Sequence, residues 1–267
     1  MSERSADLER IEAALALARD VLREFVPGAV EGRVKEVGGL VTAADLAVDA
    51  ALARFLPQAG EGWLSEETRD DPDRLARRRV WIVDPIDGTR HFFDGLPEWS
   101  VSIGLVEAGR AVAGGVMLPG RDLTIVGAEG LGVRANGERV GVRRNVSLAR
   151  AEILVSRSEH ERGSWERYRG APFSVRPHGS IAAKLALVAA GLADATWTLE
   201  PRHEWDVAAG VGLVGAGGGE AWLPDGGGVR FNLPRPILPG LFAAPPDLAG
   251  ELRAWLAGPR APSPARG

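Results

Sequence analysis

The segment 81–89, Trp-Ile-Val-Asp-Pro-Ile-Asp-Gly-Thr, combines residue types that could bind a metal ion and a phosphate. An apolar strand predicted over 80–83 leads to two carboxylates, Asp84 and Asp87, on a turn stiffened by the proline between them. The Gly-Thr pair that follows opens a predicted helix, whose free N–H groups suit a phosphate. Paired acids suit a hard divalent cation. The pattern predicts a metal and phosphate site, against the alternative of a plain Asp-Gly turn.

Acidic residues elsewhere in the chain extend this set. Glu66 and Glu67 follow an apolar pair upstream, and Asp206 stands where a helix of small residues begins. Taken singly, a Glu pair is typical of a solvated surface and Asp206 is typical of a helix N-cap. Taken with Asp84 and Asp87, they form a coherent set of oxygen ligands.

The spacing of the two aspartates separates two kinds of phosphatase chemistry. Haloacid-dehalogenase-like phosphatases carry a similar string, Asp-x-Asp-Gly-Thr, in which the nucleophile and the acid lie two residues apart. Here Asp84 and Asp87 lie three residues apart with a proline between them. The spacing therefore indicates metal-activated water instead of a phospho-aspartate intermediate.

Composition excludes several other classes. The 267-residue chain has no Cys, which rules out disulfides, thiol nucleophiles and thiolate metal sites, and its four His are scattered. A net charge of −4 argues against a nucleic-acid polymer as partner. No apolar run reaches the roughly eighteen residues that span a bilayer, and the N-terminus lacks a signal-peptide pattern. We expect a cytoplasmic protein with no membrane partner.

Apolar periodicity predicts the elements that position these residues. Helices are expected over 6–26 and 42–56, the second with Thr42 as N-cap and Asp45 in capping-box position. A meander of strands follows over 99–133. After about residue 145, strands and helices alternate, which favours an α+β lobe followed by a smaller α/β lobe.

We therefore predict three regions. Residues 1–145 form the metal- and phosphate-binding α+β lobe, and residues 146–257 form the α/β lobe that completes the substrate site. Residues 258–267 are too polar and proline-rich to pack, and we expect a disordered tail.

The sequence resembles the magnesium-dependent, lithium-sensitive phosphomonoesterases typified by inositol monophosphatase. The resemblance covers nearly the whole chain and implies a layered αβαβα sandwich of the inositol monophosphatase and sugar phosphatase type, a homodimer, and two or three Mg²⁺ ions per active site. The motifs that carry it are Lys35 with Val41-Thr-Ala-Ala-Asp45, Glu66-Glu67, Asp84 to Thr89, Gly130 to Gly137, Gly179-Ser180 and Trp205-Asp-Val-Ala-Ala-Gly210.

The resemblance also implies roles for individual residues. Glu66, Asp84 and the carbonyl of Ile86 would bind one metal, and Asp84, Asp87 and Asp206 a second. Thr89 with Glu66 would orient the attacking water, while the amides of Gly88 and Thr89 hold the phosphate. Catalytic roles thus fall to Glu66, Thr89 and Asp87, and substrate contacts to Gly179 and Ser180; Lys35, Asp45 and Glu67 are accessory candidates.

Substrate choice is open between two branches of this family. Arg90-His91-Phe92 replaces the Thr-Asn-Phe usual in inositol phosphatases, and Glu200 is one residue out of place for an inositol contact. The second lobe resembles 3′(2′),5′-bisphosphate nucleotidases, and Lys184 could meet a second phosphate, unless it is only a surface lysine. We favour adenosine 3′,5′-bisphosphate as substrate, with inositol phosphate as the alternative. A non-catalytic regulatory protein on the same fold is a further alternative.

Overall fold

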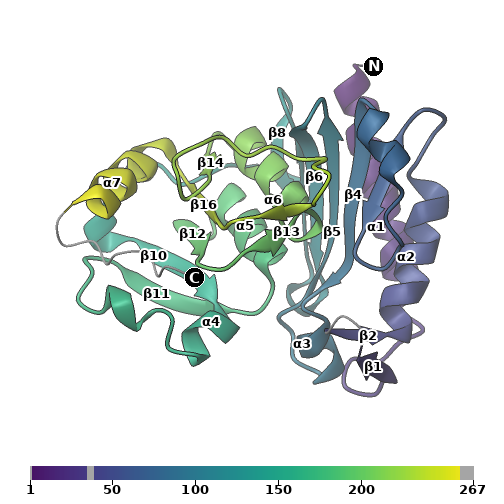
Figure 1. Ribbon diagram of the computed structural model, residues 1–267, viewed down its shortest axis with the longest axis horizontal. Coiled ribbons are helices and arrows are strands. Elements are labelled where there is room, and N and C mark those ends of the chain that lie inside the picture. The colour runs from purple at the N-terminus through teal and green to yellow at the C-terminus, as the bar shows by residue number, and fades with distance from the viewer. Residues whose placement is uncertain (1, 35–38, 259–267) are drawn as a thin grey trace.

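The computed structural model describes residues 2–34 and 39–258, which fold into five layers (Figure 1). Two N-terminal helices cover the outer face of a seven-stranded sheet, and a second pair of helices fills the space between it and a five-stranded sheet. A C-terminal helix packs on the outer face of the five-stranded sheet. The predicted αβαβα sandwich is therefore confirmed.

The seven-stranded sheet supplies three of the proposed metal-binding groups. Its order is β3-β4-β5-β6-β7-β8-β9; β3 is parallel to β4, and the other neighbouring pairs are antiparallel. Its central strands are buried along most of their length because helices cover both faces. The strands are β3 (Gly62–Ser65), β4 (Arg79–Asp87), β5 (Ser100–Glu107), β6 (Arg110–Leu118), β7 (Leu123–Ala128), β8 (Gly132–Ala135) and β9 (Glu138–Val140).

The five-stranded sheet has the order β11-β10-β12-β16-β14. β10 is parallel to both its neighbours, and β16 is antiparallel to both of its own. Its strands are β10 (Glu152–Ser156), β11 (Ser174–His178), β12 (Ala195–Thr198), β14 (Glu220–Trp222) and β16 (Leu241–Ala244). Two short ladders pair β1 (Gly32–Val34) with β2 (Leu40–Thr42) and β13 (Arg202–His203) with β15 (Ile237–Leu238).

The two predicted N-terminal helices are present, and one of them ends earlier than expected. α1 ends at residue 22 instead of 26, and Val26 beyond it is 65% exposed. α2 begins with the predicted capping box between Thr42 and Asp45. The helices are α1 (Glu3–Leu22), α2 (Ala43–Phe55), α3 (Thr89–Phe93), α4 (Arg157–Glu161), α5 (Ile181–Ala189), α6 (Glu204–Ala216) and α7 (Pro246–Ala257).

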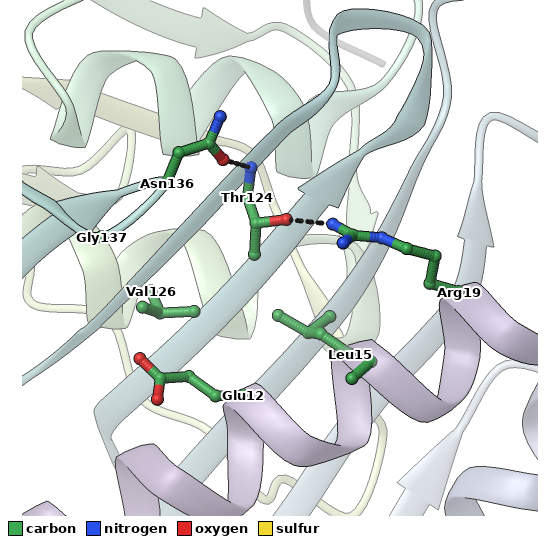
Figure 2. A pocket seen from close by; sticks show the side chains of 8 residues that line it. Glu12, Leu15, Arg19, Thr124, Val126, Asn136 and Gly137 are labelled. Atoms are coloured by element: carbon green, nitrogen blue, oxygen red, sulfur yellow. Dashed lines mark hydrogen bonds between the residues drawn. The ribbon is translucent and has the colours of Figure 1, made fainter.

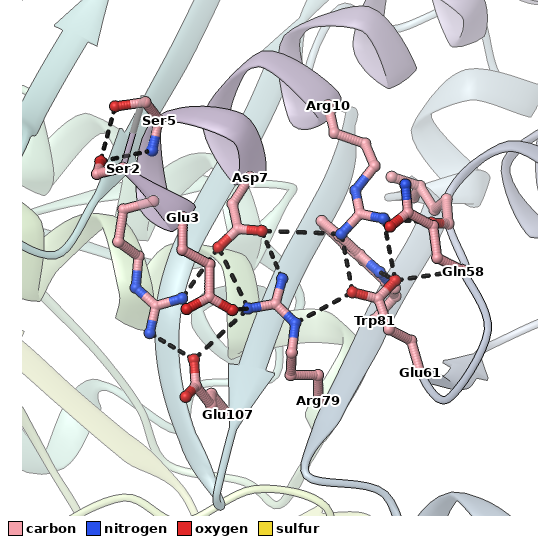
Figure 3. Close-up of polar contacts among 12 residues, drawn as sticks. Ser2, Glu3, Ser5, Asp7, Arg10, Gln58, Glu61, Arg79, Trp81 and Glu107 are labelled. Carbon is pink, nitrogen blue, oxygen red and sulfur yellow. Dashed lines mark hydrogen bonds and ion pairs between the residues drawn. The ribbon is translucent and has the colours of Figure 1, made fainter.

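A network of ion pairs holds α1 against the first sheet, where β4 begins (Figure 3). Arg79 of β4 lies between Asp7 of α1 and Glu61, and its Nε is 3.1 Å from Glu61 Oε1. Arg10 of α1 binds the same carboxylate at 2.8 Å. The side chains of Asp7 and Glu61 are only 3% and 9% exposed, so solvent screens these pairs little. The network joins the N-terminal helix to the strand that carries the two aspartates.

Two glycines let α6 lie directly on the first sheet. Gly104 of β5 and Gly114 of β6 face each other in register. A Cβ on Gly104 would lie 2.7 Å from the backbone nitrogen of Ala209, and one on Gly114 would lie 2.3 Å from its carbonyl oxygen. The backbone of α6 therefore packs directly against the backbone of the first sheet. This contact brings Asp206 to the first sheet, although α6 follows the first strands of the second sheet in the chain.

The two sheets share apolar core. One buried cluster joins strands of the first sheet to α5, α6 and Leu154 of β10. The division near residue 145 stays a prediction.

Among the described helices, none is both long and apolar enough to cross a membrane. Lys35 and residues 259–267, which make up most of the predicted tail, lie outside the described residues.

Candidate functional site

The two aspartates of β4 lie on an irregular stretch of strand, not on a turn. Asp84 pairs with Ser102 of β5 and Asp87 pairs with Ser100, so three steps along β4 match two along β5. The expected turn is thus wrong: the extra residue forms a bulge, which tolerates Pro85 because a bulged residue need not donate to the ladder. The bulge leaves Asp84 and Asp87 2% and 9% exposed at the end of the strand.

A cleft of about 430 Å³ opens at this end of the first sheet. It collects the proposed ligands from three places: Glu66 just after β3, the aspartates of β4, and Asp206 of α6. Its lining comprises Val34, Gly39, Leu40, Glu66, Asp84, Ile86, Asp87, Gly88, Thr89, Arg90 and Asp206. All the residues predicted to bind metal, and both predicted to hold the phosphate through their amides, therefore meet in one cleft.

Asp206 reaches the cleft from the first turn of α6. The helix begins two residues before it, and the Asp206 carboxylate accepts a hydrogen bond of 3.1 Å from the backbone N–H of His203. The reading of Asp206 as an N-cap is therefore wrong, since His203 holds that position. Glu204, the first residue of the helix, is buried and accepts backbone hydrogen bonds from Asn232 and Leu233, at 2.7 and 2.8 Å.

The cleft carboxylates repel one another. Burial raises the pKa of Asp84 well above its usual range, and the charges of Glu66, Asp87 and Asp206 raise it further. Burial likewise raises the pKa of Asp206, and the charges of Asp87 and Glu66 raise it further. A bound cation would reverse both effects, because it favours the ionised forms.

The donor set fits a hard cation that keeps part of its water shell. The cleft offers side-chain carboxylates and the backbone carbonyl oxygen of Ile86, and such oxygen donors are what Mg²⁺ prefers. Within residues 2–34 and 39–258, no three His, Cys, Asp or Glu side chains form a ready-made metal cage. Mg²⁺ does not require a complete protein cage, since it usually retains waters and binds substrate phosphate together with protein carboxylates.

Asp87 is held from behind by the start of α5. Its Oδ2 accepts hydrogen bonds of 2.6 Å from Ser180 Oγ and 2.6 Å from the backbone N–H of Ala182. Burial raises the pKa of Asp87, and these hydrogen bonds, with the charge of Lys184, partly oppose that rise. Ser180, predicted as a substrate contact, thus orients a proposed metal ligand and does not line the cleft.

Thr89 is tied to Asp45, an accessory candidate. Its hydroxyl lies 3.0 Å from Asp45 Oδ1 and 3.0 Å from the carbonyl oxygen of Ile86. Asp45 is 1% exposed and also accepts the backbone N–H of Thr42 at 2.8 Å. The capping box that starts α2 therefore also supports a residue of the cleft.

Other predicted substrate residues lie away from the cleft lining. Lys184 is 1% exposed, so the alternative of a surface lysine is wrong; burial lowers the pKa of Lys184 to about 8. Glu200 is 41% exposed and pairs with Arg162 at 2.5 Å. Gly179, a predicted substrate contact, and Glu67, an accessory candidate, are also absent from the residues that line the cleft.

One titratable group beside the site escaped the sequence reasoning. His178, at the end of β11, is 5% exposed, and its Nδ1 has no hydrogen-bond partner within the described chain. Burial lowers the pKa of His178 to about 4; Lys184 and Arg121 also lower it, while Glu98 acts in the opposite direction. A lone histidine in a strand gives no sequence signal for such burial.

Arg90 is a cleft residue for which the sequence motifs predict no role. It follows the Asp-Gly-Thr string directly, on the first turn of α3, and it is exposed. Its place next to Thr89 was a signal that the sequence carried. Arg90 adds a cation to a lining that otherwise contains four acids.

A second cavity, of about 250 Å³, lies between α1 and β7 (Figure 2). There Arg19 donates to Thr124 Oγ1 at 2.9 Å, and Asn136 accepts from the backbone N–H of Thr124. It contains none of the predicted site residues. The chemistry read from the sequence therefore belongs to the cleft at the end of β4.

Known proteins match the chain along most of its length. A sequence model of the inositol monophosphatase family matches residues 5–258. An inositol-1-monophosphatase of Mesorhizobium japonicum is 32% identical over 81% of this chain and 85% of its own. A 3′-phosphoadenosine 5′-phosphate phosphatase of Mycobacterium bovis is 32% identical over 80% of this chain and 81% of its own.

Other matches are shorter or purely structural. A fructose-1,6-bisphosphatase/inositol-1-monophosphatase of Thermotoga maritima is 39% identical over 53% of this chain. The match spans 55% of the length of that relative, and it also spans 55% of the length of a relative from Aquifex aeolicus. The solved inositol monophosphatase from Anabaena superposes with a TM-score of 0.74 at 26% identity, covering 97% of this chain and 98% of its own. With the family match running through both sheets and the cleft, the chain belongs to the inositol monophosphatase family.

Proposed function

We propose that this protein is a Mg²⁺-dependent phosphomonoesterase that hydrolyses a small phosphorylated metabolite with a metal-activated water. The observation that carries the proposal is the convergence of Glu66, Asp84, Asp87 and Asp206 on one cleft. Thr89, hydrogen-bonded to Asp45, lies on the same wall. Such a set of hard oxygen donors beside a hydroxyl group suits phosphoryl transfer to water.

The residues divide into metal-holding and phosphate-holding groups. Glu66, Asp84 and the Ile86 carbonyl would hold one Mg²⁺, and Asp84, Asp87 and Asp206 a second, with two or three ions in all. When bound, Mg²⁺ neutralises the phosphate dianion and lowers the pKa of the attacking water. A carbonyl oxygen has two lone pairs, so the Ile86 carbonyl can bind a cation whether or not it also accepts the Thr89 proton.

The chain's own groups place the water and the phosphate. The Thr89 hydroxyl has one proton; when it is donated to Asp45, the oxygen lone pairs are free to accept a hydrogen bond from water. Glu66 is the carboxylate that we assign to the same water. The amides of Gly88 and Thr89 would hold the phosphate, and Gly88 takes a positive φ of 97° that glycine adopts without strain.

For the substrate we favour a nucleoside 3′,5′-bisphosphate, with inositol phosphate as the alternative. Arg90 supports this choice, because a cation on the cleft wall suits a leaving group that carries a second anion. Relatives named for each substrate match at the same 32% identity over similar lengths, so they favour neither. Lys184 does not line the cleft, which leaves Arg90 as the cation we assign to a second phosphate.

Phosphate release tests the proposal. Adenosine 3′,5′-bisphosphate, inositol 1-phosphate, fructose 1,6-bisphosphate and histidinol phosphate are compared with and without Mg²⁺. Asp87→Asn should lower kcat by at least about 100-fold, because a metal ligand supplies several kcal/mol of transition-state stabilisation. The matched control is Asp20→Asn on α1, which removes an aspartate that is 64% exposed and should leave kcat unchanged.

Two outcomes would contradict the proposal. Turnover that is unaffected by chelation, or by Asp87→Asn, would refute the metal assignment. Metal binding without hydrolysis of any tested phosphate would favour the non-catalytic alternative, although the cleft retains all four proposed carboxylates. We also expect a cytoplasmic homodimer; cell fractionation tests its location, and light scattering of the purified protein tests its oligomeric state.

A further inference from the structure

Glu98 lies where three segments from both sheets meet. It precedes β5, in the loop that follows α3. Its carboxylate accepts hydrogen bonds from Arg157 of α4, 2.6 Å from Nη2 to Oε1 and 3.0 Å from Nε to Oε2. It also accepts the backbone N–H of Gly179 at 3.0 Å. Glu98 thus joins a loop of the first sheet to two segments of the second, and it does not line the cleft.

The backbone carbonyl of Glu98 lies close to two glycines, Gly88 and Gly179. A Cβ placed on Gly88 would lie 3.0 Å from the Glu98 carbonyl oxygen, and one placed on Gly179 would lie 2.7 Å from the same atom. The same Gly179 position would also press on His91, at 2.6 Å from its Cε1. The Glu98 backbone therefore lies between Gly88, which we expect to hold the phosphate, and the Gly179–Ser180 turn before α5, and it leaves no space for a side chain at either glycine.

The Gly179–Ser180 turn contacts Asp87 through a hydrogen bond. Gly179, which Glu98 holds, is followed by Ser180, whose hydroxyl donates to Asp87 Oδ2 at 2.6 Å. Ala182 donates its backbone N–H to the same oxygen. The hydroxyl groups of Ser180 and Ser100 lie 2.9 Å apart, which fixes Ser180 to β5 as well. A chain of short contacts therefore runs from Glu98 to a proposed metal ligand.

We propose that Glu98, clamped by Arg157, is a positioning residue for the Asp87 carboxylate. It fixes the Gly179–Ser180 turn so that Ser180 and Ala182 keep one Asp87 oxygen occupied and leave the other directed to the metal. The inference rests on the proposed function, since it concerns metal binding in the same cleft.

The size of the effect follows from the position of Glu98 in this chain of contacts. Residues that orient a metal ligand typically change metal affinity or activity by about 10- to 100-fold when removed. Glu98 acts through the Gly179–Ser180 turn, so we expect the lower end, about 10-fold. Its side chain is 25% exposed and that of Arg157 36%, and pairs exposed to this degree add little to folding stability. Metal affinity should therefore fall while the fold stays intact.

The experiment compares Glu98→Ala and Glu98→Gln in the full chain. Mg²⁺ binding is measured by calorimetry without substrate, alongside the Mg²⁺ dependence of phosphate release and the melting temperature. Glu98→Ala should weaken Mg²⁺ binding about 10-fold and leave the substrate KM at saturating Mg²⁺ within about twofold. Glu98→Gln keeps an oxygen that accepts from Gly179, so it should restore most of the affinity.

The matched control is Glu220→Ala, which removes an ion pair with Arg253 of 2.8 Å in the second half of the chain, away from the cleft. It should leave Mg²⁺ binding unchanged. Wild-type Mg²⁺ affinity in Glu98→Ala would overturn the proposal, and so would a loss that only tracks a lowered melting temperature and that Glu98→Gln does not restore. Wild-type protein that binds no Mg²⁺ would instead overturn the proposed function, and with it this inference.

Discussion

Gly114→Ala tests whether the close contact of α6 with the first sheet sets the position of Asp206. The added Cβ would lie 2.3 Å from the carbonyl oxygen of Ala209, whereas ordinary contacts begin at 3.4 Å, so the two backbones must separate by about 1.1 Å (3.4 − 2.3). Overpacking of this kind costs about 1–3 kcal/mol of unfolding free energy. A displacement of about 1 Å at a catalytic group can cost about 100-fold in kcat.

The assay pairs urea unfolding with Mg²⁺-dependent phosphate release. Gly215→Ala is the control, because Gly215 lies in the same helix and a Cβ there meets nothing within 4 Å. The control should gain up to about 1 kcal/mol from better helix propensity and keep its activity. If Gly114→Ala retained both wild-type stability and wild-type kcat, the argument that direct backbone contact positions Asp206 would be refuted.

Three further predictions concern residues around Asp87. Ser180→Ala should raise the Mg²⁺ concentration for half-maximal activity about 10-fold. A selective rise in substrate KM would contradict this and show that Ser180 contacts the substrate. Lys184→Met should change KM for adenosine 3′,5′-bisphosphate and for inositol 1-phosphate by the same factor, because the lysine is buried off the cleft; a selective effect on the bisphosphate would show direct contact. The pKa of His178 falls from 6.5 to about 4 on folding, so the unfolded chain takes up the proton first and stability is lost as pH drops through that interval. His178→Asn should remove about 3 kcal/mol of this acid sensitivity in urea titrations at pH 7 and pH 4, and an unchanged difference between the two pH values would contradict it.

The sequence predicted those parts of the site that are encoded locally. The capping box of Thr42 and Asp45 spans one helical turn, and the Asp84–Thr89 string places ligands and phosphate loop within a few residues. Such patterns depend on near neighbours in the chain, so they can be read without knowing the fold. The layered sandwich was expected only from the family resemblance that these motifs carry, not from the local patterns themselves.

What could not be predicted depends on contacts between distant segments. Ser180 was assigned to the substrate because nothing in its neighbourhood reveals a partner 93 residues earlier in the chain. Glu98 meets Arg157 and Gly179, 59 and 81 residues later, and no local spacing marks it. The bulge at Asp84 and Asp87 likewise depends on register with β5, which the residues of β4 alone do not determine.

The return of α6 to the first sheet has a consequence for how the chain can be divided. The connection over 141–151 separates Glu66, Asp84 and Asp87 from Asp206, yet α5 and α6 bury their apolar faces against strands on the other side of it. A nick in this connection would leave two fragments, each with a large uncovered apolar face and neither with the full set of carboxylates. Recovery of Mg²⁺ binding on mixing the two fragments would then report directly on reassembly of the sandwich.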